Sequence, residues 1–561
     1  MKNAIFLIYC TLLAAIAQAQ TFNWVRTFGG WSSENAVATA LDAEGNIYTV
    51  GTFTGAVDFD PSYTSAMHFS KGENDIFIQK LGTKSNFIWA LSYGSPYEDA
   101  VTSIAVDKKG DVIVVGRFIG TIDLDPGPLK NNLTSLGAYD NFILKFNSSG
   151  VLLWGKSYGS AYSDYVNDVA VDDSGNIYST GYFEVGADYD PGVGVATITS
   201  KGSNDVFVQK LNADGEFIWV KTFGGKGDDI GTSIALDAYG NVYTTGGFYD
   251  TVDFDPGPSN VSRTATGATS NDAFIHKMDR NGKLIWVKTF GGVLSELPVS
   301  MTIDRFGSLY SVGRYDGVVD FDPGVGIDKY LTNHGSYLHK MDTLGNYYWA
   351  GYMEGTINAI AHNVATDKLG SVYIVGTFNA AHIVLGSVHM SLITGVNSND
   401  AFILKADAQG NLIWAKTFGG KYHDACHSIA IDTLGSIYTV GYFQDTVDFD
   451  PSSKVVKLGS NGGTDVFVLK YVQKLTSQEN LLYDGLITIA PNPTKGTANI
   501  LFDQLQQEVT LTLTDIQGRL QYHQTYHQLK QTQLELKGPP GVYLLTIKTS
   551  QGQTIFKMIK E

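Results

Sequence analysis

The sequence has 561 residues, of which 43% are apolar and 17% charged, so it is long enough for several domains or one large repeat array. Its 62 glycines and 12% aromatic residues favour short strands joined by tight turns over helices. The formal net charge of −17, without clustered Lys or Arg, argues against nucleic acid and anionic membrane surfaces as partners.

The first nineteen residues are typical of a signal peptide. Lys2 is followed by a largely apolar run over residues 4–16 and by the small-x-small sequence Ala17-Gln18-Ala19. We expect signal peptidase to cleave after residue 19, and the run is too short to anchor the chain in a bilayer. The mature chain would then have no transmembrane segment. It would keep a single cysteine, Cys426, so an intramolecular disulfide is excluded.

A tryptophan ladder divides most of the remaining chain into repeats. Successive spacings are 65, 65, 65, 67, 63 and 65 residues, within near-copies of the sequence IWVKTFGG. The ladder consists of Trp24, Trp89, Trp154, Trp219, Trp286, Trp349 and Trp414. A lysine ladder follows the same steps at Lys80, Lys145, Lys210, Lys277, Lys340, Lys405 and Lys470. These ladders define the seven repeats that we number 1 to 7.

Each repeat is expected to form four antiparallel strands. In repeat 4 we expect strands over residues 233–237, 241–246 and 273–277, followed by the tryptophan strand. Two Asx-x-x-Gly turns close its short hairpins, and their glycines can adopt the positive φ that such turns need. The glycines of the first turn are Gly45, Gly110, Gly175, Gly240, Gly307, Gly370 and Gly435.

Repeated four-stranded sheets predict an all-β fold, a seven-bladed β-propeller over residues 20–472. The array starts with a lone tryptophan strand (22–28) and ends after a third strand (466–471). These two should pair and close the ring, whereas an open solenoid would leave both unpaired. On W-x-K-T-F-G-G, D-x-x-G-N-x-Y and N-D-x-F-I-x-K, the repeats resemble bacterial SBBP β-propeller repeats.

A polar linker (473–484) and a different domain (485–561) follow the repeats. Alternating apolar residues and turn signals predict a small C-terminal β-sandwich in that domain. Its motifs P-N-P-x-x-G, D-x-x-G-R and G-x-Y-x-x-x-I, and its Lys-containing last strand, resemble the type A sorting domain of type IX secretion. The residues that carry the resemblance are Pro491, Asn492, Pro493, Gly496, Asp515, Gly518, Arg519, Gly541, Tyr543, Lys557 and Lys560.

The resemblance implies export through the periplasm, recognition of the tail by the outer-membrane type IX machinery, and usually removal of the tail. The protein would then be secreted or attached to the outer cell surface.

Two acidic features map to the longer loops, which should lie on one face of a propeller. One is Asp-x-Asp-Pro, at Asp58, Asp60, Asp123, Asp125, Asp188, Asp190, Asp253, Asp255, Asp320, Asp322, Asp448 and Asp450. The other is an acid four residues after a Gly-Gly or Gly-Ser pair, at Glu34, Asp99, Asp164, Asp229, Glu296 and Asp424. Repeat 6 lacks both features, which suggests that they touch each other within a repeat.

Three roles for these acids stay open. They could cap turns by accepting backbone N–H bonds, hold a structural calcium ion at the Asp-x-Asp-Pro loops, or contact a ligand directly. Without a cation, clustered carboxylates would repel and one pKa should rise. The cluster His423-Asp424-Ala425-Cys426-His427 could bind zinc in principle, but histidines four apart converge poorly outside a helix.

No catalytic motif accompanies these features, so the sequence predicts a non-catalytic binding protein. Its long-loop face would bind an extracellular polysaccharide or a surface protein, with no certain cofactor. One alternative is a secreted lyase or glycosidase. It would use residues that break the repeat, namely Tyr330, His334, Tyr337, His339 and His362. The other alternative is a structural surface-layer protein.

Overall fold

The computed structural model describes residues 20–62, 64–124, 131–267, 270–324, 326–385, 388–392, 398–450, 452, 454–473, 487–490, 494–515, 519–549 and 552–560. The predicted signal peptide and residues 474–484 of the predicted linker lie outside this range. The chain divides into two compact parts, with Phe22–Val472 in one and the residues from Gln473 onward in the other. Every regular element described is a strand, which confirms the all-β class.

Repeats 1 to 4 each form a group of four antiparallel strands, and each group carries a two-stranded hairpin between its second and third strands. Repeat 1 contains β2 (Asn35–Leu41), β3 (Ile47–Phe53), β6 (Asp75–Leu81) and β7 (Phe87–Tyr93), with hairpin β4 (Ala56–Asp58) and β5 (Met67–Phe69). Repeat 2 contains β8 (Ala100–Val106), β9 (Val112–Phe118), β12 (Asp140–Phe146) and β13 (Leu152–Tyr158), with β10 (Thr121–Asp123) and β11 (Asn132–Thr134). Repeat 3 contains β14 (Asp164–Val171), β15 (Ile177–Glu184), β18 (Asn204–Leu211) and β19 (Phe217–Phe223), with β16 (Ala187–Asp188) and β17 (Thr197–Ile198). Repeat 4 contains β20 (Ile230–Leu236), β21 (Val242–Phe248), β24 (Asp272–Met278) and β25 (Leu284–Gly292), with β22 (Thr251–Asp253) and β23 (Ser262–Thr264).

Repeats 5 and 6 have the same order of pairing but longer strands. Repeat 5 uses β26 (Glu296–Ile303), β27 (Ser308–Asp320), β28 (Lys329–Asp342) and the start of β29 (Tyr347–Thr366). Repeat 6 uses the end of β29, then β30 (Val372–Leu385), β31 (Val388–Leu392), β32 (Asp400–Ala406) and β33 (Leu412–Phe418). β29 continues from repeat 5 into repeat 6, and β25 of repeat 4 pairs with β27, so the strands of repeats 4 to 6 form one larger sheet.

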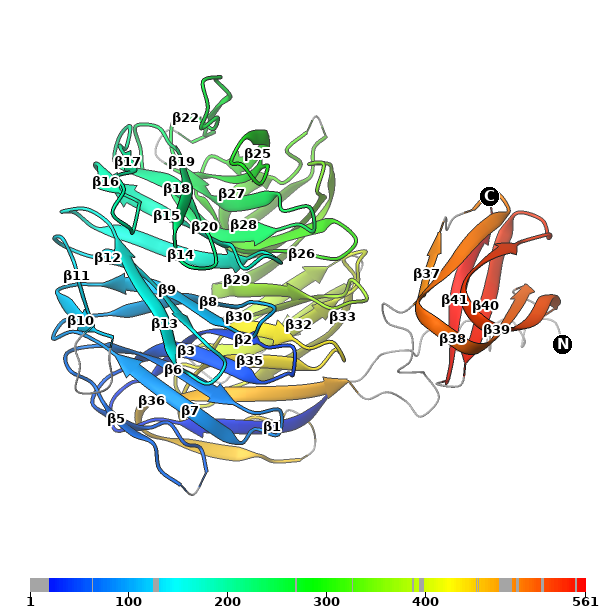
Figure 1. Cartoon of the computed structure of the whole chain (residues 1–561), viewed down its shortest axis with the longest axis horizontal. Coiled ribbons are helices and arrows are strands. Elements are labelled where there is room, and N and C mark those ends of the chain that lie inside the picture. Colours follow the sequence, from blue (N-terminus) through cyan, green and yellow to red (C-terminus); the bar gives the residue numbers. More distant parts are fainter. Residues whose placement is uncertain are drawn as a thin grey trace. The chain divides into compact units, whose positions relative to one another are not determined.

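Repeat 7 is completed by the N-terminus, as the sequence predicts. It contains β34 (Ala425–Ile431), β35 (Ile437–Asp448) and β36 (Lys457–Gln473), and β36 pairs with β1 (Gln20–Phe28). Figure 1 shows β1 in blue beside β36 at the end of the array. Thus the lone N-terminal strand covers the edge that β36 would otherwise expose.

The turn glycines adopt the predicted conformation. In the first Asx-x-x-Gly turn of every repeat, the glycine has a φ between 78° and 83°. In repeat 1, the Asp42 carboxylate accepts the backbone N–H of Asn46 at 2.8 Å, and the Gly45 N–H bonds the Asp42 carbonyl. The aspartate and the glycine therefore close this hairpin together.

Adjacent repeats pack face to face and are joined by the lysine ladder. One buried cluster, for example, combines Tyr48 and Ile78 of repeat 1 with Val114 and Phe142 of repeat 2. The Lys145 ammonium group lies 3.1 Å from Asp107 and 3.4 Å from Asp111, and it also donates to the Ala213 carbonyl of the next repeat. Four other lysines of the ladder, Lys80, Lys210, Lys277 and Lys340, also donate their ammonium group to a backbone carbonyl in a turn of the following repeat. The repeated lysine is therefore an electrostatic link between neighbours.

Replacing Lys145 with Ala should lower the free energy of unfolding by about 3 kcal/mol, because it leaves buried carboxylates without their cation. The control is Lys108→Ala, which removes an exposed ion pair to Asp173 and should cost less than about 1 kcal/mol. Urea unfolding of both variants of the full chain measures the difference. Equal losses in the two variants would contradict the role assigned to the ladder.

The C-terminal part is a separate β-fold with its own core. It contains β37 (Ile487–Ala490), β38 (Thr497–Asp515), β39 (Leu520–Glu535), β40 (Gly541–Thr549) and β41 (Gly552–Lys560). The long β38 pairs with β37, β39 and β40, around buried side chains that include Leu511 and Leu545.

Several sorting-motif residues hold this part together. The Arg519 guanidinium group lies 2.6 Å from Asp515, and the Tyr543 hydroxyl donates to the Pro539 carbonyl. The Lys560 ammonium group donates to the carbonyls of Leu536 and Gly538, while Gly496 N–H bonds the hydroxyl of Thr494. Gly541 starts β40 and Lys557 lies in β41. Pro491, Asn492, Pro493 and Gly518 lie outside the described residues.

Candidate functional site

The two kinds of long loop lie together, because at several junctions the connection between repeats pairs with the hairpin of the following repeat. Gly30 bridges Val57, Gly159 bridges Asp188 and Gly224 bridges Asp253. The same contact between repeats 4 and 5 joins β25 to β27. Figure 1 shows the hairpin strands β5, β10, β11, β16 and β17 on the left of the ring, and we call this side the long-loop face.

The Asp-x-Asp-Pro aspartates cap turns within the hairpins. The first carboxylate, for example Asp58, accepts the backbone N–H of Asp60 at 3.1 Å and of Ala66 at 2.8 Å. Asp188, Asp253, Asp320 and Asp448 repeat both bonds, and Asp123 repeats the second of them. The second carboxylates, Asp60, Asp190, Asp255, Asp322 and Asp450, each accept the N–H two residues on. Asp125 lies outside the described residues.

The acids that follow the glycine pairs are completely buried, at 0% exposure in all six repeats that have them. Glu34 accepts the Gly30 N–H at 2.8 Å, and Gly30 bridges the residue before Asp58. The two acidic features are thus neighbours through the glycine backbone. A ligand on the long-loop face would not reach these six carboxylates.

Each of these buried acids faces a second carboxylate, which the sequence reasoning missed. The partner is the aspartate of the D-x-F sequence in the third strand of the preceding repeat. The pairs are Asp465 with Glu34, Asp75 with Asp99, Asp140 with Asp164, Asp205 with Asp229, Asp272 with Glu296, and Asp400 with Asp424. Every partner is at most 8% exposed. The motif was visible in the sequence, but its partner lies across a junction between repeats.

One junction replaces both members of the pair. Between repeats 5 and 6 the third strand carries Gly335 at the position of the aspartate, five residues before Lys340, and the position of the acid is Ala359. The Ser336 hydroxyl donates to the Ala359 carbonyl at 2.7 Å and accepts the Ala361 N–H at 2.9 Å. Loss of the acid therefore coincides with loss of its partner. The Ser336 contact is not a substitute for the pair, because Asn141 accepts the equivalent Val166 N–H at a junction that keeps both carboxylates.

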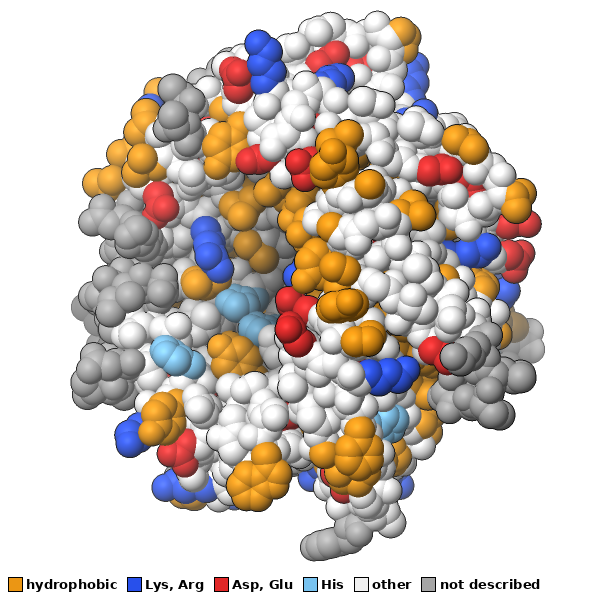
Figure 2. Space-filling model, turned by 90° about the vertical axis from the view of Figure 1, so that its left-hand side faces the viewer, with side chains coloured by type: hydrophobic (Ala, Val, Ile, Leu, Met, Phe, Trp, Pro, Cys, Tyr) orange, Lys and Arg blue, Asp and Glu red, His pale blue; other side chains and the backbone are white. Residues whose placement is uncertain are grey.

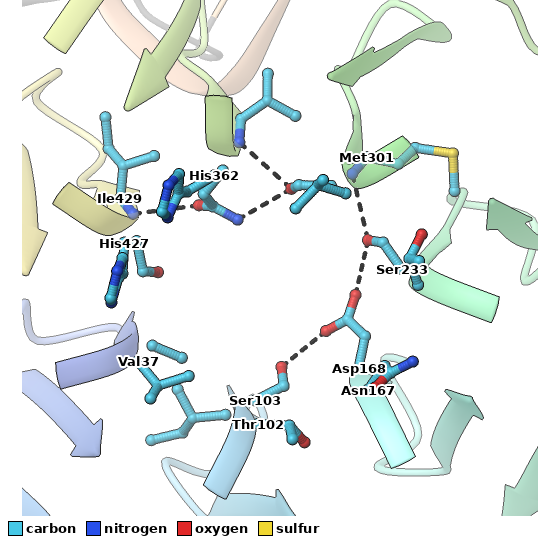
Figure 3. Close-up of a pocket in the computed structure, with 18 of the residues that line it drawn as sticks. Val37, Thr102, Ser103, Asn167, Asp168, Ser233, Met301, His362, His427 and Ile429 are labelled. Carbon is cyan, nitrogen blue, oxygen red and sulfur yellow. Dashed lines mark hydrogen bonds between the residues drawn. The ribbon is translucent and has the colours of Figure 1, made fainter. Parts of the chain in front are cut away.

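A cavity of about 710 Å³ occupies the centre of the ring. Its lining comes from the first strands of all the repeats, and Figure 2 shows the hollow with histidine side chains inside it. In Figure 3, His362 and His427 lie on one side of the cavity, and Asn167 and Asp168 lie on another. The two histidine rings are stacked 4.9 Å apart, and burial lowers the pKa of His362 to about 3. Burial also lowers the pKa of His427, so both histidines line the cavity as neutral hydrogen-bonding groups.

Asp168 is held by a network of hydrogen bonds in the lining of the cavity (Figure 3). Its carboxylate accepts the hydroxyls of Ser103 and Ser233, at 2.7 and 2.8 Å, and the N–H groups of Val169 and Ile234. The Ser233 hydroxyl in turn accepts the Met301 N–H at 3.2 Å. Burial raises the pKa of Asp168. This side chain joins three repeats around the cavity.

Of the residues that break the repeat in repeats 5 and 6 and whose side chains are described, only His362 lies in the cavity lining. Tyr337 and His339 are fully buried within repeat 5, where His339 bonds the Phe321 carbonyl at 3.1 Å. The Tyr330 hydroxyl donates to the Ala350 carbonyl. The side chain of His334 lies outside the described part of the structure.

The cluster at residues 423–427 is divided among different environments. Asp424 belongs to a buried carboxylate pair, Cys426 is buried, and His427 lines the cavity. His423 accepts the Asn399 N–H at 3.2 Å. Within the described residues, no group of three or more His, Cys, Asp or Glu side chains is placed to hold a metal ion.

Exposed aromatic side chains mark the connections between repeats on the long-loop face. Trp31 is 89% exposed, Tyr97 56%, Tyr162 50% and Tyr422 42%, and each follows a Gly-Gly or Gly-Ser pair by one or two residues. Repeat 5 has the exposed residues Val293 and Leu294 at this place. Trp31 also borders a groove of about 650 Å³ with Met67 and Asp58. The sequence reasoning did not select these aromatics, although their position after the glycine pair is a readable signal.

Comparison with known proteins defines the class of protein. A family model for the beta-propeller repeat, SBBP, matches residues 153–182. A second model, for the secretion system C-terminal sorting domain, matches residues 488–561. The chain is therefore a β-propeller repeat protein that is exported by type IX secretion to the cell surface or the extracellular space. Its tail interacts with the secretion machinery, and no helix among the described residues could span a membrane.

The curated relatives are distant. An uncharacterized WD repeat-containing protein, L264, from Acanthamoeba polyphaga mimivirus is 24% identical and aligns with 83% of this chain and 40% of that protein. The regulatory protein FlaEY of Caulobacter vibrioides is also 24% identical, over 45% of this chain and 30% of its own length. This chain thus spans less than half the length of either relative.

Two solved structures match this chain with low similarity. A protein of unknown function from Bacteroides caccae has a TM-score of 0.30 and 11% identity, covering 61% of this chain and 89% of that one. A mutant of the GH43 protein BlXynB from Bacillus licheniformis has a TM-score of 0.24 and 9% identity, covering 81% of this chain and 98% of that one.

Proposed function

We propose that this protein is a non-catalytic binding protein whose long-loop face holds an extracellular polysaccharide. The exposed aromatic side chains on the connections between repeats, Trp31, Tyr97, Tyr162 and Tyr422, are the observation that carries this proposal. Large aromatic groups are costly to leave in water, and their presence at equivalent places of several repeats favours a binding role.

The chemistry of these side chains suits sugar rings. An aromatic ring has a negative face, which attracts the weakly positive C–H groups of a pyranose, while tyrosine hydroxyls can bond its hydroxyl groups. Trp and Tyr also lose little conformational entropy on binding, because they have few rotatable bonds. Several exposed aromatic side chains on one face would contact a repeating polymer at more than one place, and this would raise the avidity of the protein for the polymer.

The central cavity favours binding over catalysis. Asp168 is the one carboxylate among the described residues that line it, and its two oxygens accept four hydrogen bonds from the protein. A glycosidase would need two carboxyl groups flanking the scissile bond. Tyr337 and His339, which an enzyme could use instead, are buried within repeat 5. The cavity therefore suits uncharged hydrogen-bonding ligands.

The test measures retention of the full chain on a panel of immobilised bacterial and plant polysaccharides. On a polysaccharide that retains the protein, Trp31→Ala should weaken binding about tenfold, the cost of losing one central aromatic contact of about 1.4 kcal/mol. The control is Tyr239→Ala, because Tyr239 is 85% exposed but lies in a tight hairpin turn and not on a connection between repeats. Equal weakening by both variants would contradict the proposed face. Failure of every polysaccharide would favour a surface protein as the partner.

A further inference from the structure

The six carboxylate pairs are contacts between repeats that place two acids in one small buried space. A Cβ atom at Gly29 would lie 2.4 Å from an oxygen of Asp465 and 2.7 Å from an oxygen of Glu34. At Gly159 the corresponding distances to Asp140 and Asp164 are 2.8 and 3.0 Å. At these two junctions the first glycine of the Gly-Gly or Gly-Ser pair therefore leaves room for two facing carboxyl groups.

In several of the pairs, both carboxyl groups keep an unused oxygen in the buried space. In the pair Asp75–Asp99, one oxygen of Asp75 accepts the Lys71 N–H and one of Asp99 accepts the Ser95 N–H. The Oδ1 atoms of both residues are buried without a hydrogen-bond partner. The pair Asp272–Glu296 has the same arrangement, with Asp272 Oδ1 and Glu296 Oε1 unpartnered. Two ionised carboxylates would repel here and leave both oxygens unsatisfied.

We propose that each pair holds one proton, so that a neutral carboxyl group donates a hydrogen bond to the facing carboxylate and links adjacent repeats. Protonation removes one of two like charges and supplies the missing donor at once. The junction between repeats 5 and 6 supports this reading, because there both carboxylates are replaced together, by Gly335 and Ala359. The ring would then have six proton-dependent contacts between repeats and one junction without such a contact.

Other charged or titratable groups lie around the pairs and favour or oppose their ionisation. Lys71 faces Asp75 and Lys201 faces Asp205, and both favour the ionised partner. Asp228 faces Asp229 and Asp316 faces Glu296, and both oppose ionisation. The neutral groups nearby are Tyr158 and Tyr189 beside Asp164, Tyr337 beside Glu296, and Cys426 and Tyr442 beside Asp424.

The direction of the pH dependence follows from burial. Burial raises the pKa of Glu34, Asp99, Asp164, Asp229 and Asp424 to about 7, and that of Glu296 to about 9. In the unfolded chain these groups titrate near their ordinary value of about 4. Between the two values the folded chain binds more protons, so stability is greatest in acid and falls as the pH rises from about 4 through 7 to 9.

The test is thermal unfolding of the full chain between pH 5 and pH 9, with Glu296→Gln as the main variant. The amide introduced by this substitution would keep the acceptor for Gly292 N–H and donate permanently to Asp272. The loss of melting temperature between pH 5 and pH 9 should therefore shrink by about 1–2 °C. Two controls should leave that loss unchanged: Glu73→Gln on the surface, and Ser336→Ala at the junction without a pair. Infrared spectra at pH 6 should also show bands of protonated carboxyl groups that are weaker at pH 9.

Two results would overturn the proposal. A melting temperature that does not fall towards pH 9, together with no infrared band of protonated carboxyl groups at pH 6, would show that the pairs hold no proton. If calcium chloride raises the melting temperature at pH 8 and a chelator reverses it in the wild type but not in Glu296→Gln, the pair holds a cation instead.

Discussion

A chain that lacks β1, residues 20–28, should lose cooperative folding of the propeller. The deletion removes the buried side chains of Val25 and Phe28, and Phe28 packs against Phe59 and Phe77 with ring centroids 5.5 and 5.6 Å apart. Burial of two such side chains contributes about 3–6 kcal/mol, which is a large part of the stability of a typical domain. The deletion also exposes the long edge of β36, so the shortened chain should aggregate. Circular dichroism and size-exclusion chromatography measure the outcome.

A permuted chain separates loss of the strand from loss of its position. In the control, residues 20–30 are moved behind Gln473 and joined by a copy of the turn at residues 212–216, which connects the third and fourth strands of repeat 3. This chain should fold and melt cooperatively, because its last repeat then has the connectivity of the others. A deleted chain that stays monomeric and melts like the wild type would contradict closure of the ring by β1.

Removal of residues 485–561 should abolish delivery to the cell surface or the medium, with the shortened protein accumulating in the periplasm. The sorting domain is an independent fold with its own core, and its removal leaves the described propeller strands intact. Fractionation of a host with a type IX secretion system, followed by quantification of the protein in each fraction, measures the effect.

The matched control for export is Trp31→Ala, which changes an exposed side chain of the propeller and should reach the surface in normal amounts. A host without the outer-membrane translocon should retain both chains. Normal delivery of the shortened chain would contradict the role of the tail.

The sequence was sufficient for the features that repeat along the chain. The tryptophan and lysine ladders, the turn glycines and the pairing of the terminal strands all follow from local pattern and period, and the structure has them where they were predicted. The turn-capping role of Asp58 was among the roles left open, because an aspartate before a tight loop fits either a cap or a calcium ligand.

The sequence was insufficient where a contact crosses from one repeat to the next. Asp75 and Asp99 belong to different repeats, so no pattern within one repeat reveals that they face each other. The same limit applies to the Lys145 contact with Ala213 and to the hydrogen bonds of Asp168 with Ser103 and Ser233. Exposure of Trp31 and Tyr97 was overlooked, although both follow a glycine pair, because many aromatic residues of this chain are core residues.

The most direct test of the proposed function measures retention and chemical change in the same wells. The full chain is incubated with each polysaccharide of the panel, and bound protein and newly formed chain ends are quantified after extended incubation. We expect retention on at least one polysaccharide, weakened by Trp31→Ala, without new chain ends. New chain ends that increase with protein concentration would contradict the account and identify the protein as a polysaccharide-cleaving enzyme.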